Sequence, residues 1–467
     1  MRHFDMSKTP LVLASIIRII ASHNKLRRAI LAVKALNNTV GKLPRKAQKE
    51  MAIVSRLCVC ALISLSLFLG CATETPRKVE AKALVEGSMR EVVIRPGGPI
   101  HIACWMVISG RDASLGTDTK RGVEIAVDDI GGKLLGHPIE ITTQDTRCNA
   151  EGGQAAATKL ASDPTIVAAV GSNCSSAATP GAPILWKAGI VTVSPSNTDP
   201  RLTDPKRGSQ YEGYLRTSWN DKVHGKVAAE FLSMHLKLTN AATISDGSIY
   251  SEEVRTSFTE TFENLGGTVI VQETIAPTET NMGGLLNKIA ASDAEAIYFP
   301  IFVAAGSRIV RQAREIPALQ KVVLISADGT FTPDFYKKAG DAAVGMYHSC
   351  PDFSSFDRLY MEFVSKYRQR YGRKPIAPFH AFAYDAAMMI FAAVEKVAKR
   401  SEDGTLSIDR KELRDSLYGT KDFPGLTGNL TCTPTGDCGD FKIGIFQTTE
   451  KNVNDLKLPD RVFWKPY

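Results

Sequence analysis

From Pro99 onward, short apolar runs alternate with longer segments that carry their apolar residues on one helical face. Residues 100–108 and 166–170 are typical of strands buried on both sides, and residues 116–130 are typical of an amphipathic helix. Strands that alternate with helices form right-handed βαβ units, and these units build a parallel sheet covered on both faces. The sequence therefore predicts an α/β fold.

The alternation runs through the chain twice. A first set ends with a strand at 190–193, and an extended segment at 211–217 leads away from it. A second set runs from a helix at 223–238 to a strand at 322–326. Two sheets in tandem fit the two or three domains that 467 residues allow. The remaining predicted elements are helices at 353–371 and 379–399, a β hairpin within 429–447, and a tail at 462–465.

The stretch 170–176 joins a predicted strand to a predicted helix that runs to Lys187. The chain turns at Gly171 and enters the helix through serines, and a helix N-terminus with free N–H groups and hydroxyls favours an anion. The pattern recurs where the strand at 190–193 ends in Ser194-Pro195-Ser196-Asn197-Thr198. Because ligands of open α/β sheets bind at the carboxyl ends of the strands, these two strand ends predict a site for a small carboxylate.

Residues 51–71 have the pattern of an export signal. Arg56 gives a short basic region, and the apolar stretch 57–69 is too short for an ordinary membrane span. The segment ends in Leu-Gly-Cys71 and resembles a bacterial lipoprotein signal, in which the lipidated Cys71 becomes the mature N-terminus. The alternatives are an ordinary secretory signal and a signal anchor. We expect an exported body, held by lipid at Cys71, in the periplasm or on the cell surface of a bacterium.

Residues 1–50 precede this signal and are interpreted as a mis-called extension upstream of a start at Met51. They hold 11 Lys and Arg against 2 Asp and Glu. This surplus of 9 exceeds the formal charge of +8 for the whole chain, so the remaining 417 residues sum to −1. A nearly neutral body gives no indication of a nucleic-acid surface. Residues 72–98 are polar and are interpreted as a tether.

Six cysteines follow the signal, and export permits disulfides among them. Cys148 and Cys174 each follow a strand end, where adjacent crossovers would bring them together. Cys432 and Cys438 flank a tight turn and can close a small loop. A zinc site is the alternative, but the sequence has no CxxC pair and no His at ligand spacing to support it, and we expect neither metal nor cofactor. The other two cysteines are expected to be buried thiols: Cys104 and Cys350.

Several motifs occur in one order along residues 99–447, and together they carry a family resemblance. The motifs are Ser109-Gly110, Asp145-Thr146-Arg147-Cys148, Gly171-Ser172-Asn173-Cys174-Ser175-Ser176, Ser194 to Thr203, Tyr250 after Ser245-Asp246, Arg311-Gln312-Ala313-Arg314, Asp341 to Met346, and Phe441 to Gln447. The set resembles the leucine/isoleucine/valine-binding proteins, which are periplasmic substrate-binding proteins of ABC importers.

The resemblance implies the type I periplasmic binding fold: two Rossmann-like α/β lobes with parallel sheets, joined by a hinge of three crossing strands. Lobe one is expected at 99–217 plus 350–443, and lobe two at 218–349 plus 444–467. The ligand lies between the lobes, and closure about the hinge traps it.

The resemblance also assigns ligand contacts. Ser175, Ser196 through its backbone, and Thr198 receive the ligand carboxylate, and Asp328 receives the ligand ammonium. It likewise places the family's cysteine pair on Cys148 and Cys174. A zwitterion that bridges both lobes satisfies both groups of contacts, and this couples occupancy to closure.

The side-chain pocket departs from the family pattern. Tyr250 is kept, whereas Phe302 stands where a Tyr is expected and Leu115 where a Trp is expected. The family also contains binders of amides, urea and aromatic acids, so the departures leave the ligand's side chain open. Taken singly, Ser175 could cap a helix, Tyr250 and Phe302 could belong to the core, Leu115 could lie in a surface loop, and Asp328 could begin a plain turn.

We therefore expect a lipid-anchored substrate-binding protein of an ABC importer that binds an amino acid or an amino-acid-like molecule. Its partners are the ligand and the ABC permease subunits; it has a monomeric body, no nucleic-acid partner, and membrane contact through the lipid alone. The alternative is a ligand-sensing pair of lobes that serves a signalling partner. An enzyme is not expected, because Asp246, His224 and Ser251 come without the Gly-x-Ser-x-Gly elbow of a hydrolase.

Overall fold

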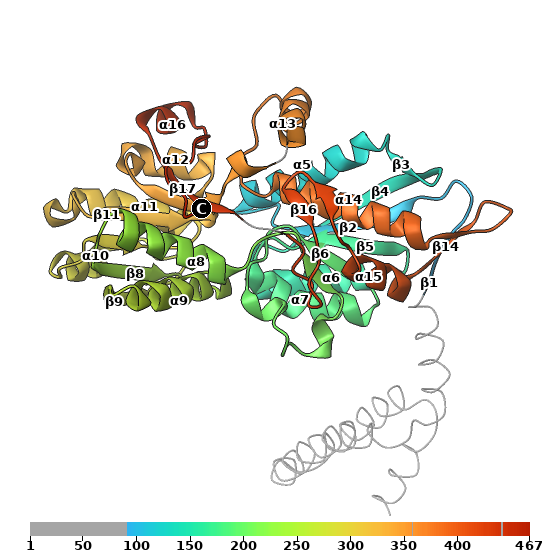
Figure 1. The fold of residues 1–467 in the computed structure, drawn as a ribbon, viewed down its shortest axis with the longest axis horizontal. Helices are drawn as coiled ribbons and strands as arrows, with labels where there is room; N and C mark the ends of the chain where they lie inside the picture. Colours follow the sequence, from blue (N-terminus) through green and yellow to red (C-terminus); the bar gives the residue numbers. More distant parts are fainter. Residues whose placement is uncertain (1–90, 357, 440–441) are drawn as a thin grey trace, which may run out of the picture. The chain divides into compact units, whose positions relative to one another are not determined.

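The computed structural model describes residues 91–356, 358–439 and 442–467 (Figure 1). Residues 1–50, the predicted signal at 51–71 with its lipidation site Cys71, and most of the predicted tether lie outside this part. In the described ranges, each helix is either too short or too polar to traverse a lipid bilayer.

The first sheet has six strands in the order β3-β4-β2-β5-β6-β7. All of its neighbouring strands are parallel except the short β3, which pairs antiparallel with β4. We call this sheet with its covering helices lobe one. Its strands are β2 (Ile100–Met106), β3 (Lys133–Leu134), β4 (His137–Asp145), β5 (Ile166–Gly171), β6 (Val191–Ser194) and β7 (Tyr214–Arg216).

Strand β2 shows why this sheet is covered on both faces. All seven of its residues are buried, and alternate side chains enter different clusters. Ile102 and Cys104 belong to a cluster that includes residues of α5 (Ala113–Asp129) and α14 (His380–Val397). Ala103 and Trp105 belong to another, with residues of α6 (Ala150–Ala161) and α7 (Ser175–Lys187). A strand with two buried faces therefore reads as a continuous apolar run.

The second sheet is the core of lobe two and has the strand order β17-β12-β11-β10-β8-β9. Its strands are parallel except at the β12–β17 pair. The strands are β8 (Asn240–Ser245), β9 (Thr268–Thr274), β10 (Ala296–Tyr298), β11 (Val323–Ala327), β12 (Tyr347–Pro351) and β17 (Ile443–Gln447). The helices that follow these strands or precede them are α8 (Asp221–Glu230), α9 (Ile249–Asn264), α10 (Gly283–Ala290), α11 (Val303–Glu315), α12 (Pro333–Ala339) and α16 (Glu450–Asp455).

The chain passes between the two sheets three times. It leaves lobe one after β7 and enters α8, returns after β12, and crosses again to reach β17. The second and third crossings lie side by side, because Cys350 of β12 faces Gly444 of β17 in an antiparallel register. Three adjacent crossings give two rigid α/β halves with a narrow connection, which is the arrangement of a hinge.

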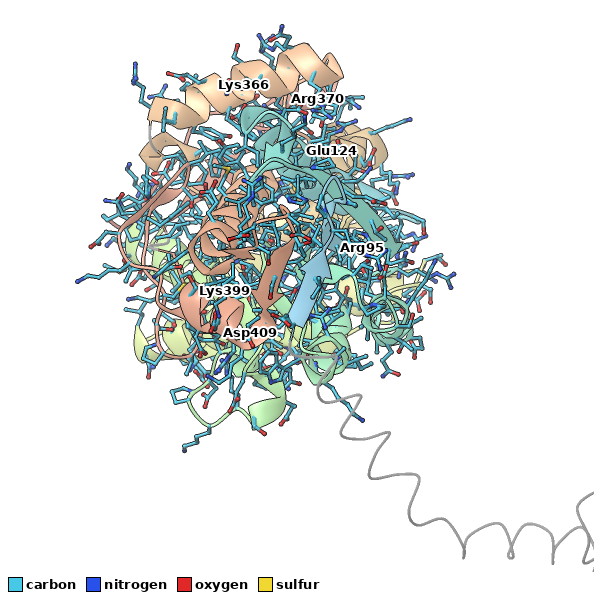
Figure 2. The ribbon with its side chains drawn as sticks, turned by 90° about the vertical axis from the view of Figure 1, so that its right-hand side faces the viewer. Arg95, Glu124, Lys366, Arg370, Lys399 and Asp409 are labelled. Atoms are coloured by element: carbon cyan, nitrogen blue, oxygen red, sulfur yellow. A yellow bond between two sulfur atoms is a disulfide. The ribbon has the colours of Figure 1, made fainter. Side chains whose placement is uncertain are left out.

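Helix α13 (Arg358–Tyr371) lies on the outside of lobe one, where it buries Tyr360, Phe363 and Tyr367 in a cluster with residues of α5 and α14 and adds ion pairs at its exposed edge. Figure 2 labels its Lys366 and Arg370 and, below them, Glu124 of α5. The Lys366 ammonium is 2.7 Å from a carboxylate oxygen of Asp129, and Arg370 pairs with Asp128. These exposed ion pairs orient α13, and each is worth at most about 1 kcal/mol.

Two expectations from the sequence are wrong in detail. Residues 91–98 were expected in the tether, but Glu91–Ile94 form β1, which pairs antiparallel with β14 (Leu406–Asp409) and buries Val92 and Ile94. The segment 429–447 is not one hairpin. Its first part pairs as β16 (Gly428–Leu430) with β15 (Phe423–Gly425), and its last part is β17 in lobe two. In both cases the strand with which the segment pairs lies elsewhere in the sequence.

Both cysteine pairs expected from the sequence are bonded. Cys148 joins Cys174 with 5.1 Å between their Cα atoms, and Cys432 joins Cys438. The other two cysteines are free and buried, as expected, and burial raises the pKa of the Cys104 thiol to about 12. These two thiols are inert at neutral pH, because the thiolate is the reactive form.

Close packing of α6 on α7 depends on a glycine, and this gives a test of the fold. A Cβ at Gly153 would lie 2.4 Å from the Ala177 carbonyl oxygen, whereas a Cβ at Gly284 in α10 would meet nothing within 4 Å. We expect Gly153→Ala to destabilise the protein by about 1–3 kcal/mol and Gly284→Ala to stabilise it by up to about 1 kcal/mol. Urea unfolding of both variants measures the difference. Equal midpoints would contradict the packing of α6 on α7.

Candidate functional site

All seven residues that the sequence analysis assigned to a ligand line one small cavity between the sheets. Its lobe-one wall includes Leu115, Ser175, Ser196 and Thr198, and its lobe-two wall Tyr250, Phe302 and Asp328. The cavity measures about 10 Å³, which is room for about one water molecule. Four further residues also line it: Asn173, Cys174, Gly329 and Phe379.

The lobe-one wall is formed where two parallel strands end. Strand β5 ends at Gly171 and leads into α7, whose first residue is Ser175; the N-cap is Cys174, so the hydroxyl of Ser175 is not the cap. This hydroxyl accepts the Asp199 N–H at 3.3 Å and keeps its own proton to donate. The first N–H groups of a helix have no partner within the helix. The start of α7 is therefore a set of neutral donors suited to a carboxylate.

Strand β6 ends at Ser194 and supplies the second half of this wall. The Ser196 hydroxyl donates to the Asn173 carbonyl at 2.9 Å, and the Ser196 N–H contacts the Ser194 hydroxyl at 3.3 Å. Both donors of Ser196 are thus engaged within lobe one, and its carbonyl takes no part in these bonds. The contact of the Ser196 backbone with a ligand carboxylate stays a prediction.

A buried arginine that the sequence analysis did not assign to the site holds the loop that carries Thr198. The Arg216 guanidinium donates to the carbonyls of Asn197 at 3.2 Å and Asp199 at 2.9 Å. It also donates to the Thr203 hydroxyl at 2.6 Å and to a carboxylate oxygen of Asp437 at 2.5 Å. Since the backbone is held on both sides of Thr198, the position of that side chain is set by the first crossing of the hinge.

The lobe-two wall is centred on Asp328, which follows β11 in a short 3₁₀ turn and is buried. One of its carboxylate oxygens accepts the Tyr250 hydroxyl at 2.7 Å. The His224 Nδ1 lies 3.4 Å from the same oxygen. That nitrogen accepts the Trp219 indole N–H at 3.1 Å, while the His224 Nε2 donates to the Ser349 carbonyl at 2.7 Å. Because an indole N–H can only donate, His224 Nδ1 is the acceptor of the Trp219 bond and Nε2 is the nitrogen that faces the Ser349 carbonyl.

A second buried acid lies beside the first. The Asp221 N–H donates to the Thr198 carbonyl at 3.0 Å, and within the described chain neither carboxylate oxygen of Asp221 has a hydrogen-bond partner. Burial raises the pKa of Asp221 well above its ordinary value, the nearby Thr198 hydroxyl opposes this increase, and the negative charge of Asp328 adds to it. Burial also raises the pKa of Asp328. The sequence analysis did not assign Asp221, which lies between the predicted extended segment at 211–217 and the predicted helix at 223–238.

Aromatic and apolar side chains complete the cavity. The rings of Tyr250 and Phe302 lie 5.3 Å apart, and Leu115 is buried. Phe379, which the sequence analysis did not assign, stacks on Trp219 with 5.9 Å between ring centroids. It is positioned by Asp118 of α5, which accepts the Phe379 N–H at 3.3 Å. The apolar walls exclude water and so strengthen every polar interaction inside.

The arrangement opposes charges across the cleft. Lobe one offers neutral hydroxyl and N–H donors, and lobe two offers Asp328 with Asp221 behind the Thr198 loop. Throughout the described ranges, no set of three or more His, Cys, Asp or Glu side chains converges in a way that could hold a metal ion. The geometry suits a small molecule with an anionic end and a cationic end.

The two buried acids make stability depend on pH. Each binds its proton more tightly in the folded state than in the unfolded chain, so stability is highest below the ordinary carboxyl pKa and falls as the pH rises through the raised values. We expect Asp221→Asn to raise unliganded stability at neutral pH by about 1–3 kcal/mol, because an unpartnered buried carboxylate is removed. Thermal unfolding from about pH 4 to about pH 8 should then show a smaller decline than in the wild type.

Asp385→Asn is the matched control. Asp385 is also buried and its pKa is raised to about 6, but it accepts the Leu426 and Thr427 N–H groups and the Thr427 hydroxyl at 2.7–3.0 Å. An amide cannot accept all three, so this variant should lose stability. A loss of stability in Asp221→Asn as well would contradict the assignment of Asp221 as an unpartnered acid.

Comparisons with known proteins identify the family of the chain. The model of a periplasmic binding protein family matches residues 99–448. A Leu/Ile/Val-binding protein of Rhizobium johnstonii is 27% identical over 342 residues, which cover 73% of this chain and 89% of that protein. A leucine-, isoleucine-, valine-, threonine- and alanine-binding protein of Pseudomonas aeruginosa is 25% identical over 350 residues, with 74% and 89% covered.

Solved structures share the fold. The branched-chain amino acid transporter substrate binding protein of Streptococcus pneumoniae, in complex with isoleucine, superposes with a TM-score of 0.67 at 23% identity. The match covers 75% of this chain and 97% of that one. A solute binding protein of an ABC transporter from R. palustris, in complex with 4-hydroxybenzoate, superposes with a TM-score of 0.66 at 20% identity and 78% and 96% coverage.

Proposed function

The chain belongs to the periplasmic binding protein family, and from that premise we propose that it is the substrate-binding protein of an ABC importer for an amino acid or a close analogue. The observation that carries the proposal is the opposition of neutral donors at Ser175 and Thr198 to the buried acid Asp328 across one cavity. Named relatives that bind branched-chain amino acids support the class of ligand.

The buried acids favour an amino acid over an aromatic acid. A benzoate-like ligand has a carboxylate for the donors of lobe one but has no ammonium. It would leave Asp328 and Asp221 buried without a positive partner, and such a group costs several kcal/mol. A zwitterion supplies the missing cation.

Binding and closure are coupled in this proposal. The cavity of about 10 Å³ is too small for an amino acid, so the lobes must separate at the hinge to admit one and then close on it less tightly than they do in this structure. The closed form has contacts of its own across the cleft: Arg111 of lobe one donates to the Pro277 carbonyl of lobe two at 2.7 Å, and Arg201 lies 3.5 Å from Glu253. A ligand that contacts both lobes binds the closed form better and therefore shifts the population toward it.

Removing either end of the opposed pair should weaken binding. We expect Asp328→Asn and Ser175→Ala each to reduce the affinity for the preferred amino acid by about 1–3 kcal/mol, because a charged ligand group is left without its partner. Isothermal titration calorimetry measures the change. Asp293→Asn, an exposed acid of lobe two, serves as the control and should bind as the wild type does. Wild-type affinity in both site variants would show that the ligand binds elsewhere.

We further propose that Cys71 is lipidated and holds the body at the membrane, where it meets the permease subunits. The motif Leu69-Gly70-Cys71 after an apolar stretch supports this proposal. Cys71→Ser should move the protein from the membrane fraction to the soluble fraction of the bacterial host, as followed by immunoblotting. Cys104→Ser, which removes a buried thiol of the body, should leave the protein with the membranes. Retention of Cys71→Ser at the membrane would rule out the lipid anchor.

A further inference from the structure

A second and larger cavity adjoins the small one on the outer side of the cleft. It measures about 720 Å³ and is lined by both lobes. Phe302 lines both cavities, and the Cys148–Cys174 disulfide connects them, since Cys148 lines the outer cavity and Cys174 the inner one. A ligand whose charged head group is held by Ser175 and Asp328 would therefore direct its side chain past Phe302 toward this space.

Two buried acids line the outer cavity from opposite lobes. Asp112, at the start of α5, and Asp246, after β8, are both more than nine-tenths buried. The Oδ1 of Asp112 has no hydrogen-bond partner in the described chain, and its Oδ2 lies 3.6 Å from the Arg111 Nε, beyond hydrogen-bonding distance. Asp246 accepts the Ser248 N–H at 3.1 Å. One carboxylate of this cavity is thus left with unused acceptor capacity.

Arg111 forms an ion pair with Asp112 at 3.6 Å but donates no hydrogen bond to it. Arg111 is 41% exposed and donates across the cleft to the Pro277 carbonyl, and Arg147 is exposed. Burial raises the pKa of Asp112 to about 6, the nearby Asp246 adds to the increase, and Arg111 opposes it. The cavity therefore has a basic, exposed rim and an acidic, buried interior, which favours a donor group entering from the cleft.

We propose that the outer cavity is a subsite for the ligand's side chain, and that Asp112 and Asp246 select amino acids whose side chain ends in a hydrogen-bond donor such as an ammonium or an amide. The proposal rests on the proposed function and specifies its substrate class. It assigns selectivity to residues that the sequence analysis did not place in the site. It also accounts for the room beyond Phe302, which a short aliphatic side chain would not use.

Two pairs of near-isosteric ligands test the proposal by calorimetry on the exported body. Ornithine and norleucine differ in a terminal ammonium or methyl group, and glutamine and glutamate differ in a terminal amide or carboxylate. In the wild type we expect ornithine to bind at least about tenfold more tightly than norleucine, and glutamine at least about tenfold more tightly than glutamate, which corresponds to about 1.4 kcal/mol.

The variants Asp112→Asn and Asp246→Asn test whether these two residues determine the selectivity. Asp112 is the N-cap of α5 but makes no side-chain capping bond, so its substitution removes none. The amide oxygen of Asn can still accept the Ser248 N–H at position 246. Each variant should reduce the ratio of the affinity for ornithine to the affinity for norleucine at least threefold. The affinity for norleucine itself should stay within twofold of the wild type. Asp204→Asn, an acid of lobe one that lines neither cavity, should leave the ratio unchanged.

The outcomes distinguish a failure of the subsite from a failure of the proposed function. Affinity ratios near one in the wild type, or affinity ratios unchanged in both variants, would overturn the subsite. If binding still depends on Asp328, the proposed function would remain intact. If the wild type binds none of these four ligands and no other α-amino acid, the proposed function and the subsite both fail.

Discussion

A carboxylate buried without a counter-ion is costly, and this cost organises the cleft. Asp328 and Asp221 are both buried, and no Lys or Arg in the described residues pairs with Asp328. Two buried acids of this kind persist only when the rest of the fold is stable enough to compensate for their cost. A cation that enters the site lowers that cost. Sites of this kind therefore sacrifice stability in the free protein for affinity toward a ligand that carries the missing charge.

The hinge region fixes the position of the hydrogen-bond donors in the lobe-one wall of the cavity. Arg216 lies at the end of β7, where the chain first crosses between the lobes, and its guanidinium holds the backbone on both sides of Thr198. Its partner Asp437 belongs to the small loop closed by the Cys432–Cys438 disulfide. Asp118 positions Phe379 in the same indirect way. The Thr198 loop is thus held by Arg216, which is itself bonded to Asp437, 221 residues farther along the chain, and Phe379 is held by Asp118 across 261 residues.

Under the proposed function, the inner cavity would receive the groups that any α-amino acid has, and the proposed subsite in the outer cavity would receive the part in which amino acids differ. The disulfide between Cys148 and Cys174 joins the lobe-one walls of the two cavities. A head-group site that is shared and a side-chain site that varies would allow one fold to serve many ligands.

The sequence alone determined the alternation of strands and helices, the two cysteine pairs and seven of the eleven residues that line the inner cavity. These features have local signals: apolar runs, a strand that turns into a helix through small hydroxyl residues, and motifs in a fixed order. Only the tertiary structure revealed β1, Asp221, Arg216, Phe379 and the outer cavity with Asp112. Each depends on a partner distant in the chain, as when Glu91 pairs with Asp409. An isolated Asp or Arg has no pattern that tells a buried acceptor from a solvated surface charge, because burial is decided by the packing of the whole chain.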